Sequence, residues 1–460
     1  MPGNQPPAYP IGCRFFRKVP DVRFRPALWL AATLPLTIAV PAHAKLSRGE
    51  ARMIQTVDAE QQRTTDFLAK IVNQNSGTMN LAGVEAVRRM VEPEFQQLGF
   101  KTEWIDMKAA GRAGHVVARH AGSKRGKRLL LIAHLDTVFE PDSPFQRWQV
   151  EGSRAHGPGA GDDKGGIAVI VAALRAMQAA GTLKNANITV FMTGDEEDAG
   201  PPLTISRRDL IAEGRRADAA LDFEDLATDD CPQGTCDMGS IARRSAGSWT
   251  LTVTGRSAHS AGVGASNYGA IYELARIIDQ FRRELPEERL TYNVGLIGGG
   301  QSATMDAGRI RLEATGKTNI IAATAVARGD LRAISQDQIE RTRAKMRAIV
   351  AQSLAGAKAE ISFDEDAYPP MPPTEGNRAL LARLNGVNRD MGLAEMGELD
   401  PSKRGAGDIS FVAADVDGLV GLGPSSDGSH TDKEVVDVPS IFKQAKRAAI
   451  LMSRLAAERR

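Results

Sequence analysis

Polar residues that follow apolar, strand-like runs place the strongest constraint on how this chain can fold. His134 and Asp136 come directly after the run at 129–133, and Glu196 and Glu197 close a second such run. Strands of this kind that alternate with helical segments predict an open, largely parallel sheet. Ligand sites in such sheets lie beyond the carboxyl ends of the strands, so these side chains should gather at one edge.

Two further segments extend this pattern. Asp162 and Lys164 lie in a glycine-rich stretch that precedes the helix-like segment 166–180. A third apolar run at 219–222 leads into Glu224. A nucleotide-binding loop is excluded for the glycine-rich stretch, because the Lys-Ser/Thr ending of a phosphate-binding loop is missing. The sequence therefore predicts a site built from His and carboxylate side chains.

The N-terminus has the composition of a signal peptide. A basic stretch that ends at Arg25 precedes the apolar run 27–40 and Ala44. The run is short for a membrane span and contains Pro35, so a retained anchor is the weaker alternative. We predict cleavage of residues 1–44 and an exported protein, periplasmic or secreted, with no membrane attachment after cleavage. The predicted mature chain does not offer the clustered Lys and Arg residues that nucleic-acid binding would need.

The length of 460 residues favours two domains. From about residue 245 to 367 the pattern becomes strand, helix, two strands, helix, strand, which predicts an inserted α+β (βαββαβ) dimerisation or lid domain. Ser335 and Gln338 have the spacing of a capping box for its second helix. Residues 45–244 and 368–460 would then form one α/β catalytic domain with a mostly parallel central sheet.

Cys231 and Cys236 flank a turn-forming Pro-Gln-Gly-Thr sequence. In an exported protein a short-range disulfide is the favoured interpretation. A pair of reduced thiols is the alternative, and a cysteine metal site is the least favoured because no second pair completes it.

The ordered set of motifs resembles the co-catalytic zinc metallopeptidase family of glutamate carboxypeptidases, aminoacylases and dipeptidases, and most closely its exported glutamate carboxypeptidase branch. The resemblance covers nearly the whole chain after the leader. The matching family motifs are His-x-Asp, Asp-x-Lys-Gly, Glu-Glu, a later carboxylate and a C-terminal His. In this sequence they fall on His134 and Asp136, on Asp162, Lys164 and Gly165, on Glu196 and Glu197, on Glu224, and on His430.

The resemblance implies two zinc ions per subunit, bridged by Asp162. His134 and Glu197 would bind on one side or the other, and Glu224 and His430 would complete the ligand set. Asp136 is similar to the family carboxylate that orients the ring of the ligand His134. Glu196 resembles the general base, and Asp162-Asp163 resembles the cis peptide of the family. Asp222 is an alternative to Glu224 as a metal ligand, because the period-two alternation of a strand turns both side chains to the same side.

Other polar residues in these segments have simpler interpretations. Asp195 and Asp198 are expected to be loop charges, and His115 a surface or core residue. Gly407 stands where the family commonly has Thr or Ser, a departure that concerns local substrate contacts.

The inserted segment also carries family-like residues. His259, in Gly-Arg-Ser-Ala-His, resembles the His that reaches a neighbouring subunit's active site, which implies a homodimer through the inserted domain. Asn319 and Arg332 are similar to residues that bind the substrate carboxylate, and Arg suits that role because its planar fork meets a carboxylate with two hydrogen bonds. Arg328 is the alternative cation.

These features predict a zinc-dependent carboxypeptidase that removes a C-terminal amino acid, with glutamate as the leading candidate, from a peptide or N-acyl amino acid. Water activated by the metal would attack the amide, and Glu196 would move the proton. An N-acyl-amino-acid amidohydrolase and a dipeptidase share this machinery and remain alternatives. A non-catalytic binding protein is the alternative from a different class.

Overall fold

The computed structural model describes residues 46–232 and 234–460, so the predicted signal peptide lies outside the described residues. Three helices open this part: α1 (Arg48–Ala59), α2 (Gln61–Val72) and α3 (Leu81–Gln97). Ser47 caps α1 with a complete capping box, and the side chain of Asn80 accepts from Gly83 N at the start of α3.

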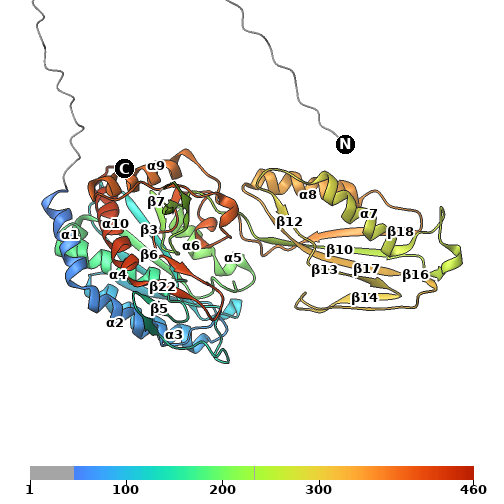
Figure 1. Cartoon of the computed structure of the whole chain (residues 1–460), viewed down its shortest axis with the longest axis horizontal. Coiled ribbons are helices and arrows are strands. Elements are labelled where there is room, and N and C mark those ends of the chain that lie inside the picture. Colours follow the sequence, from blue (N-terminus) through green and yellow to red (C-terminus); the bar gives the residue numbers. More distant parts are fainter. Residues whose placement is uncertain (1–45, 233) are drawn as a thin grey trace, which may run out of the picture. The chain divides into compact units, whose positions relative to one another are not determined.

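A six-stranded sheet forms the centre of the larger part of the fold (Figure 1). Its order is β1 (Lys101–Asp106), β2 (Gly114–His120), β6 (Asn187–Thr193), β3 (Arg128–His134), β7 (Ala219–Asp222) and β20 (Gly418–Leu419). The last four strands in this order are parallel, whereas β2 runs antiparallel to β6, and β1 to β2. The predicted mostly parallel α/β sheet is therefore confirmed.

The inner strands β3, β6 and β7 are covered on both faces, which explains why they read as nearly continuous apolar runs, whereas the edge strand β1 is half-buried to exposed. On β3, Leu129 and Leu131 belong to the core that contains α4 (Lys164–Ala179) and α10 (Val438–Ala457). Leu130 and Ile132 face the opposite core, together with Leu210 of α6 (Arg208–Gly214). Period-two alternation along one strand thus supplies two separate cores.

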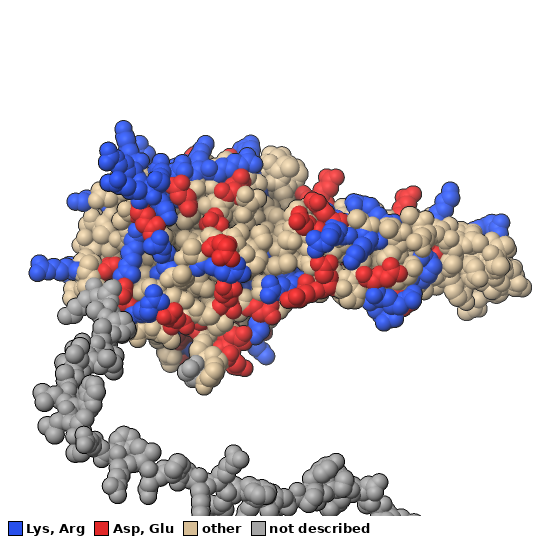
Figure 2. All heavy atoms as spheres, turned by 90° about the horizontal axis from the view of Figure 1, so that it is seen from above, with Lys and Arg blue, Asp and Glu red and all other residues tan. Residues whose placement is uncertain are grey.

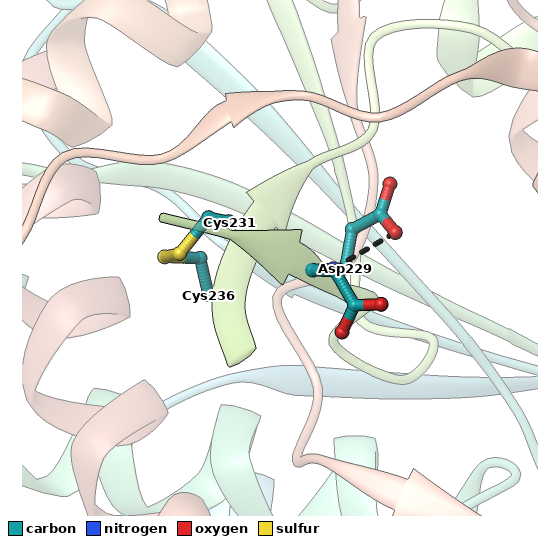
Figure 3. Close-up of a disulfide and its surroundings, with 4 residues drawn as sticks. Asp229, Cys231 and Cys236 are labelled. Atoms are coloured by element: carbon teal, nitrogen blue, oxygen red, sulfur yellow. Dashed lines mark hydrogen bonds between the residues drawn. A yellow bond between two sulfur atoms is a disulfide. The ribbon is translucent and has the colours of Figure 1, made fainter. Parts of the chain in front are cut away.

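Smaller elements surround the sheet. They are β4 (Gln149–Glu151), β5 (Arg154–His156), β21 (Ser426–Asp427) and β22 (Val435–Asp437), which form one four-stranded sheet, and β8 (Thr228–Cys231), β9 (Gly234–Gly239) and β19 (Gly397–Glu398), which form another. Helices α5 (Leu203–Ser206) and α9 (Glu375–Asp390) complete the larger part. Figure 3 shows the disulfide between Cys231 and Cys236 at the end of the β8–β9 hairpin, with their Cα atoms 5.9 Å apart. The favoured disulfide interpretation is confirmed.

A second, antiparallel sheet is built from the inserted segment. It contains β12 (Thr291–Tyr292), β17 (Thr324–Arg332), β10 (Gly247–Gly255) and β18 (Ala357–Phe363) in this order, with β13 (Leu296–Gly300) also paired to β17. Helices α7 (Gly269–Glu284) and α8 (Gln336–Val350) pack on it, and Trp249 meets Phe281 edge to face in its core. The βαββαβ order is as predicted. Short strands that the sequence analysis did not predict are β11 (Ala258–His259), β14 (Ser302–Met305), β15 (Leu312–Thr315) and β16 (Ile320–Ile321).

The surface is of mixed charge. Basic and acidic side chains are interspersed over the face shown in Figure 2. Within the described residues, no helix combines the length and the apolar character that crossing a membrane requires.

Candidate active site

The ends of three adjacent parallel strands position the site. His134 is the last residue of β3, Thr193 the last of β6 and Asp222 the last of β7. The loops that follow β6 and β7 carry Glu196 and Glu224. Because parallel neighbours end at the same edge of a sheet, these side chains converge there, as the sequence analysis expected.

The carboxylate of Asp162 lies between two imidazoles. Its Oδ1 is 3.0 Å from Nε2 of His134, and its Oδ2 is 3.2 Å from Nε2 of His430. The same His430 nitrogen is 3.1 Å from Oε2 of Glu197. One carboxylate that turns a different oxygen to each His has the geometry of a bridging ligand between two ions. The peptide bond between Asp162 and Asp163 is cis, as the family resemblance implied.

These side chains fit a pair of metal ions. Candidate ligand atoms of His134, Asp162 and Glu197 lie within 4.8 Å of one another, and so do those of His134, Glu196 and Glu224. Nitrogen and carboxylate oxygen are the ligands that zinc takes when thiolates are absent. The structure thus brings together all five predicted ligands, although Glu196, predicted as the base, also lies within ligand distance.

The pKa values of these groups indicate a surplus of buried negative charge. Burial, with Glu224 nearby, raises the pKa of Glu196 well above its usual value. Burial also raises the pKa of Glu197 to about 7. Hydrogen bonds to Asp162 and Glu197 raise the pKa of His430 to about 11. A cation bound among these carboxylates would relieve their mutual repulsion and stabilise their ionised forms.

Asp136 connects the loops that carry the site. Its Oδ1 accepts from Glu196 N at 3.0 Å, and its Oδ2 accepts from Glu197 N at 3.2 Å. The hydroxyl of Thr78 donates to Oδ2 at 2.6 Å, and Nδ1 of His134 lies 3.4 Å from Oδ1. Asp136 therefore restrains the loop of the predicted base as well as the ring of His134. Thr78 was missed because it stands 58 residues away in the sequence without a motif.

A buried ion-pair network lies behind the Glu196 loop. Arg207 donates from Nη1 to Asp195 Oδ1 at 2.6 Å and from Nε to Asp408 Oδ1 at 2.8 Å. Its Nη2 donates to Tyr368 Oη, which in turn donates to the carbonyl of Glu196 at 2.8 Å. The expectation that Asp195 is a loop charge was wrong, because the residue is 0% exposed. We name these four residues, Arg207, Asp195, Asp408 and Tyr368, the Arg207 network.

His115 packs next to the Arg207 network as a fully buried core residue, one of the two roles expected for it. Its Nε2 lies 2.8 Å from the carbonyl of Ser206, and its Nδ1 accepts from Gly194 N at 3.2 Å. These partners suit a neutral ring that donates from Nε2. Burial lowers the pKa of His115 below its usual value.

Arg243 is a second buried cation that the sequence analysis missed. Its Nη1 lies 2.8 Å from Oε2 of Glu224 and 3.5 Å from Oδ2 of Asp222. Its guanidinium also fills the space beside Gly407, since a Cβ at that position would lie 2.2 Å from Nη1. The departure from the family pattern at Gly407 therefore has a local reason. The space that a Thr or Ser side chain needs is taken by Arg243.

The predicted substrate contacts lie outside this ligand cluster. His259 is exposed on β11, where its Nδ1 accepts from Ala261 N, and Asn319 is exposed before β16. Nε of Arg332 donates to Asp330 at 2.8 Å. The alternative cation, Arg328, is already paired with Asp364 and Thr250. Within residues 46–232 and 234–460, no hydrogen bond or ion pair joins any of them to the candidate metal ligands.

His134 and several carboxylates lie at the strand ends of a parallel sheet, His430 comes to them from the segment between β21 and β22, and a separate antiparallel α+β sheet accompanies them; this arrangement is typical of a class of metal-dependent hydrolases. Comparison with known sequences agrees with this class. Residues 130–454 match Peptidase family M20/M25/M40, and the chain belongs to this family. It is a hydrolase of a metallopeptidase family and acts on amide bonds.

Known proteins are similar to this chain over nearly its whole length or over part of it. Carboxypeptidase G2 of Pseudomonas sp. (strain RS-16) is 26% identical over 442 residues, which cover 93% of this chain and 97% of that protein. Succinyl-diaminopimelate desuccinylase of Leptothrix cholodnii is 28% identical over 205 residues, 43% of this chain and 51% of that one.

Solved structures share the fold at low sequence identity. Aminopeptidase PepT from Bacillus cereus superposes with a TM-score of 0.69 at 17% identity, covering 86% of this chain and 99% of that one. A dinuclear metal-binding M20 peptidase, YXEP from Bacillus subtilis, superposes with a TM-score of 0.60 at 14% identity, covering 87% and 99%. These likenesses support the fold alone.

Proposed function

We propose that this chain is an exported, zinc-dependent carboxypeptidase that hydrolyses the amide bond of a C-terminal amino acid, with glutamate as the leading candidate. The observation that supports this proposal most directly is that the carboxylate of Asp162 lies between His134 and His430. Full-length similarity to a carboxypeptidase supports the reaction class.

The ligands divide into two sides around Asp162. His430 and Glu197 lie on the side of Oδ2, and His134 lies on the side of Oδ1. Glu224 would bind beside His134, since their candidate ligand atoms lie within 4.8 Å of one another; those of Glu197 and His134 do so too, so Glu197 is placed on the side of Oδ2 only by its contact with His430. Zinc bound on both sides would act as a Lewis acid on the scissile carbonyl and lower the pKa of water toward neutrality.

Glu196 is the proposed general base. It lies next to the candidate ligand Glu197 and is half-buried, and desolvation raises its pKa well above the usual value in the absence of metal. A carboxylate beside a metal-bound water can accept the proton of that water and return it later. Glu196 would take the proton of the attacking water and give it to the leaving amine. The Asp136 hydrogen bond to its backbone would hold it in place.

Substrate recognition would involve the inserted segment. Arg332 and Asn319 are the candidates for binding the substrate carboxylate, and His259 for assisting at the active site of a neighbouring subunit. This assignment requires a homodimer that forms through the inserted domain, residues 245–367. Residues 45–244 and 368–460 would form the catalytic domain. Export after cleavage at Ala44 completes the proposal.

An N-acyl-amino-acid amidohydrolase is the second candidate. The observation that favours it is the similarity to succinyl-diaminopimelate desuccinylases, which spans 205 residues in one of them. Such an enzyme would use the same metal centre and release an acyl group from an amino acid. A dipeptidase differs only in what lies on the acyl side of the bond, which is a single amino acid.

Metal analysis and substrate comparison test the proposal together. We expect the purified protein to contain about two zinc ions and to hydrolyse an N-acyl-glutamate, with activity lost on chelation and restored by zinc. Turnover of an N-acyl-glutamate, a dipeptide and a longer peptide separates the three candidates. His430→Ala should lower the metal content. Inactivity on all three substrates with zinc present would refute the hydrolytic assignment to these substrate classes.

A further inference from the structure

Glu434 is a buried carboxylate whose partners are backbone amides of the Asp162 loop. It is 1% exposed and lies four residues after His430. Its Oε1 accepts from Gly161 N at 2.9 Å and from Asp162 N at 3.3 Å, and its Oε2 accepts from Gly159 N at 3.3 Å. Three N–H groups of one short loop thus donate to one side chain. An ionised carboxylate can satisfy all three, because both of its oxygens accept hydrogen bonds.

The segment around Glu434 contacts the same loop at a second point. A Cβ at Gly161 would lie 2.3 Å from the Cβ of Ser426, so the two backbones approach as closely as glycine allows. The hydroxyl of Ser426 donates to Asp225 at 2.9 Å, next to the candidate ligand Glu224. Residues 426–434, which we name the C-terminal ligand segment, therefore contact the loops of two other candidate ligands.

His430 lies between these two contacts. Its backbone has φ of +66°, a left-handed conformation that is uncommon for residues other than glycine. Its side chain is 56% exposed, whereas that of Asp162 is 19% exposed. Contacts at both ends of the segment thus determine where this exposed ligand meets Asp162.

We propose that Glu434 is a positioning residue that holds Asp162 in its bridging orientation and aligns it with His430. This inference rests on the proposed two-metal function. The hydrogen bond to Asp162 N fixes the backbone from which the bridging carboxylate extends. The short connection from Glu434 to His430 couples that backbone to the ligand on the other side. Loss of the carboxylate should therefore weaken metal binding without removing any ligand.

The test is zinc affinity of the full chain carrying Glu434→Gln. Glutamine keeps the volume of the side chain, but its NH₂ group cannot accept from a backbone N–H. Losing such a partner of a metal ligand typically costs 10- to 100-fold in affinity, and we expect a decrease of about this size. Affinity is measured by competition between the metal-free protein and a chelating dye for Zn²⁺. Circular dichroism checks that the variant is folded.

A matched control separates positioning from a general loss of stability. Glu213 is also buried, at 6% exposed, but it pairs with Arg119 and Arg216. Glu213→Gln should leave the zinc affinity unchanged even where it lowers the melting temperature. As a second readout, Mn²⁺ replaces zinc, and electron paramagnetic resonance reports whether two ions are coupled through the bridge. We expect this coupling to weaken in Glu434→Gln.

The outcomes are distinguishable. Two zinc ions in the wild type, with unchanged affinity and unchanged coupling in Glu434→Gln, would overturn the positioning role and leave the proposed function intact. Fewer than two ions in the wild type would overturn the two-metal function and this inference with it. Should Glu434→Gln fail to fold, Glu434→Asp replaces it, because aspartate keeps the charge but holds it one methylene farther from the loop. A zinc affinity equal to that of the wild type in Glu434→Asp would then count against the inference.

Discussion

Replacing Arg207 with Met should cost this protein much of its stability. The guanidinium is 0% exposed and donates to two carboxylates, those of Asp195 and Asp408, which are 0% and 2% exposed. Met fills a similar volume but leaves both charges without their cation. Breaking a buried ion pair from one side costs about 3–5 kcal/mol, because the remaining charge stays desolvated. Each carboxylate keeps one other donor, Gly200 N or the hydroxyl of Thr193, so we expect a value inside this range.

Urea denaturation measures this loss. Trp104 and Trp148, both packed against the core of the parallel sheet, report its unfolding by fluorescence. A second substitution, Asp195→Asn, removes one of the two orphaned charges. It should therefore restore about 1–2 kcal/mol in the Arg207→Met background, although it destabilises the wild type. Contacting residues typically show coupling free energies of about 0.5–3 kcal/mol in such a cycle.

The neighbouring Arg208 supplies the control. Its side chain is 65% exposed and pairs with Asp209 at the surface, so Arg208→Met should change the free energy of unfolding by less than about 0.5 kcal/mol. A loss below about 1 kcal/mol in Arg207→Met, or strictly additive effects in the double variant, would refute our account of the Arg207 network.

Three other perturbations test separate parts of the structure. Glu196→Gln should lower kcat by about 10²- to 10⁴-fold and leave the zinc content near that of the wild type, measured by elemental analysis; a fall in zinc would contradict its role as base. Gly407→Ser should collide with Arg243 and lower the free energy of unfolding by about 1–3 kcal/mol, measured in urea, and an unchanged stability would mean that the guanidinium moves freely. Burial depresses the pKa of His115 in the folded chain. The unfolded chain therefore binds a proton at a higher pH than the folded chain does. The free energy of unfolding is unaffected by this group above the unfolded pKa of about 6.5 and falls as the pH drops below it. His115→Asn should remove this acid dependence, which is at most about 1.4 kcal/mol per pH unit, and equal slopes of stability against pH in both proteins would exclude it.

Much of the fold was predictable because its signals are local. The apolar runs that became β3 and β6 contain a single polar residue, Thr189 of β6, between their ends, since both faces of the sheet are covered along these strands. The inserted segment was recognised from the order of its strands and helices. Its short strands β14 and β15 were missed because β15 is half-buried to exposed and β14 has one buried residue, so neither has a continuous apolar pattern.

The candidate ligands were also predictable, but their supports were not. Residues such as His134 and Asp162 stand in short motifs at strand ends, where topology brings them together. Arg207, Arg243 and Glu434 have no comparable local signal. Each acts through partners between 12 and 275 residues away, and the same Arg or Glu in the sequence could equally be a surface charge.

Local patterns in the chain were thus enough to predict the class of sheet and the inserted α+β segment, and motif resemblance was enough to name candidate metal ligands. The folded structure was needed to show which oxygen of Asp162 faces each His, which charges are buried, and what occupies the space beside Gly407. The physical reason is that strand and helix patterns depend on neighbouring residues in the chain. Desolvation and charge pairing depend on all groups that fold into the same volume, whatever their separation in sequence.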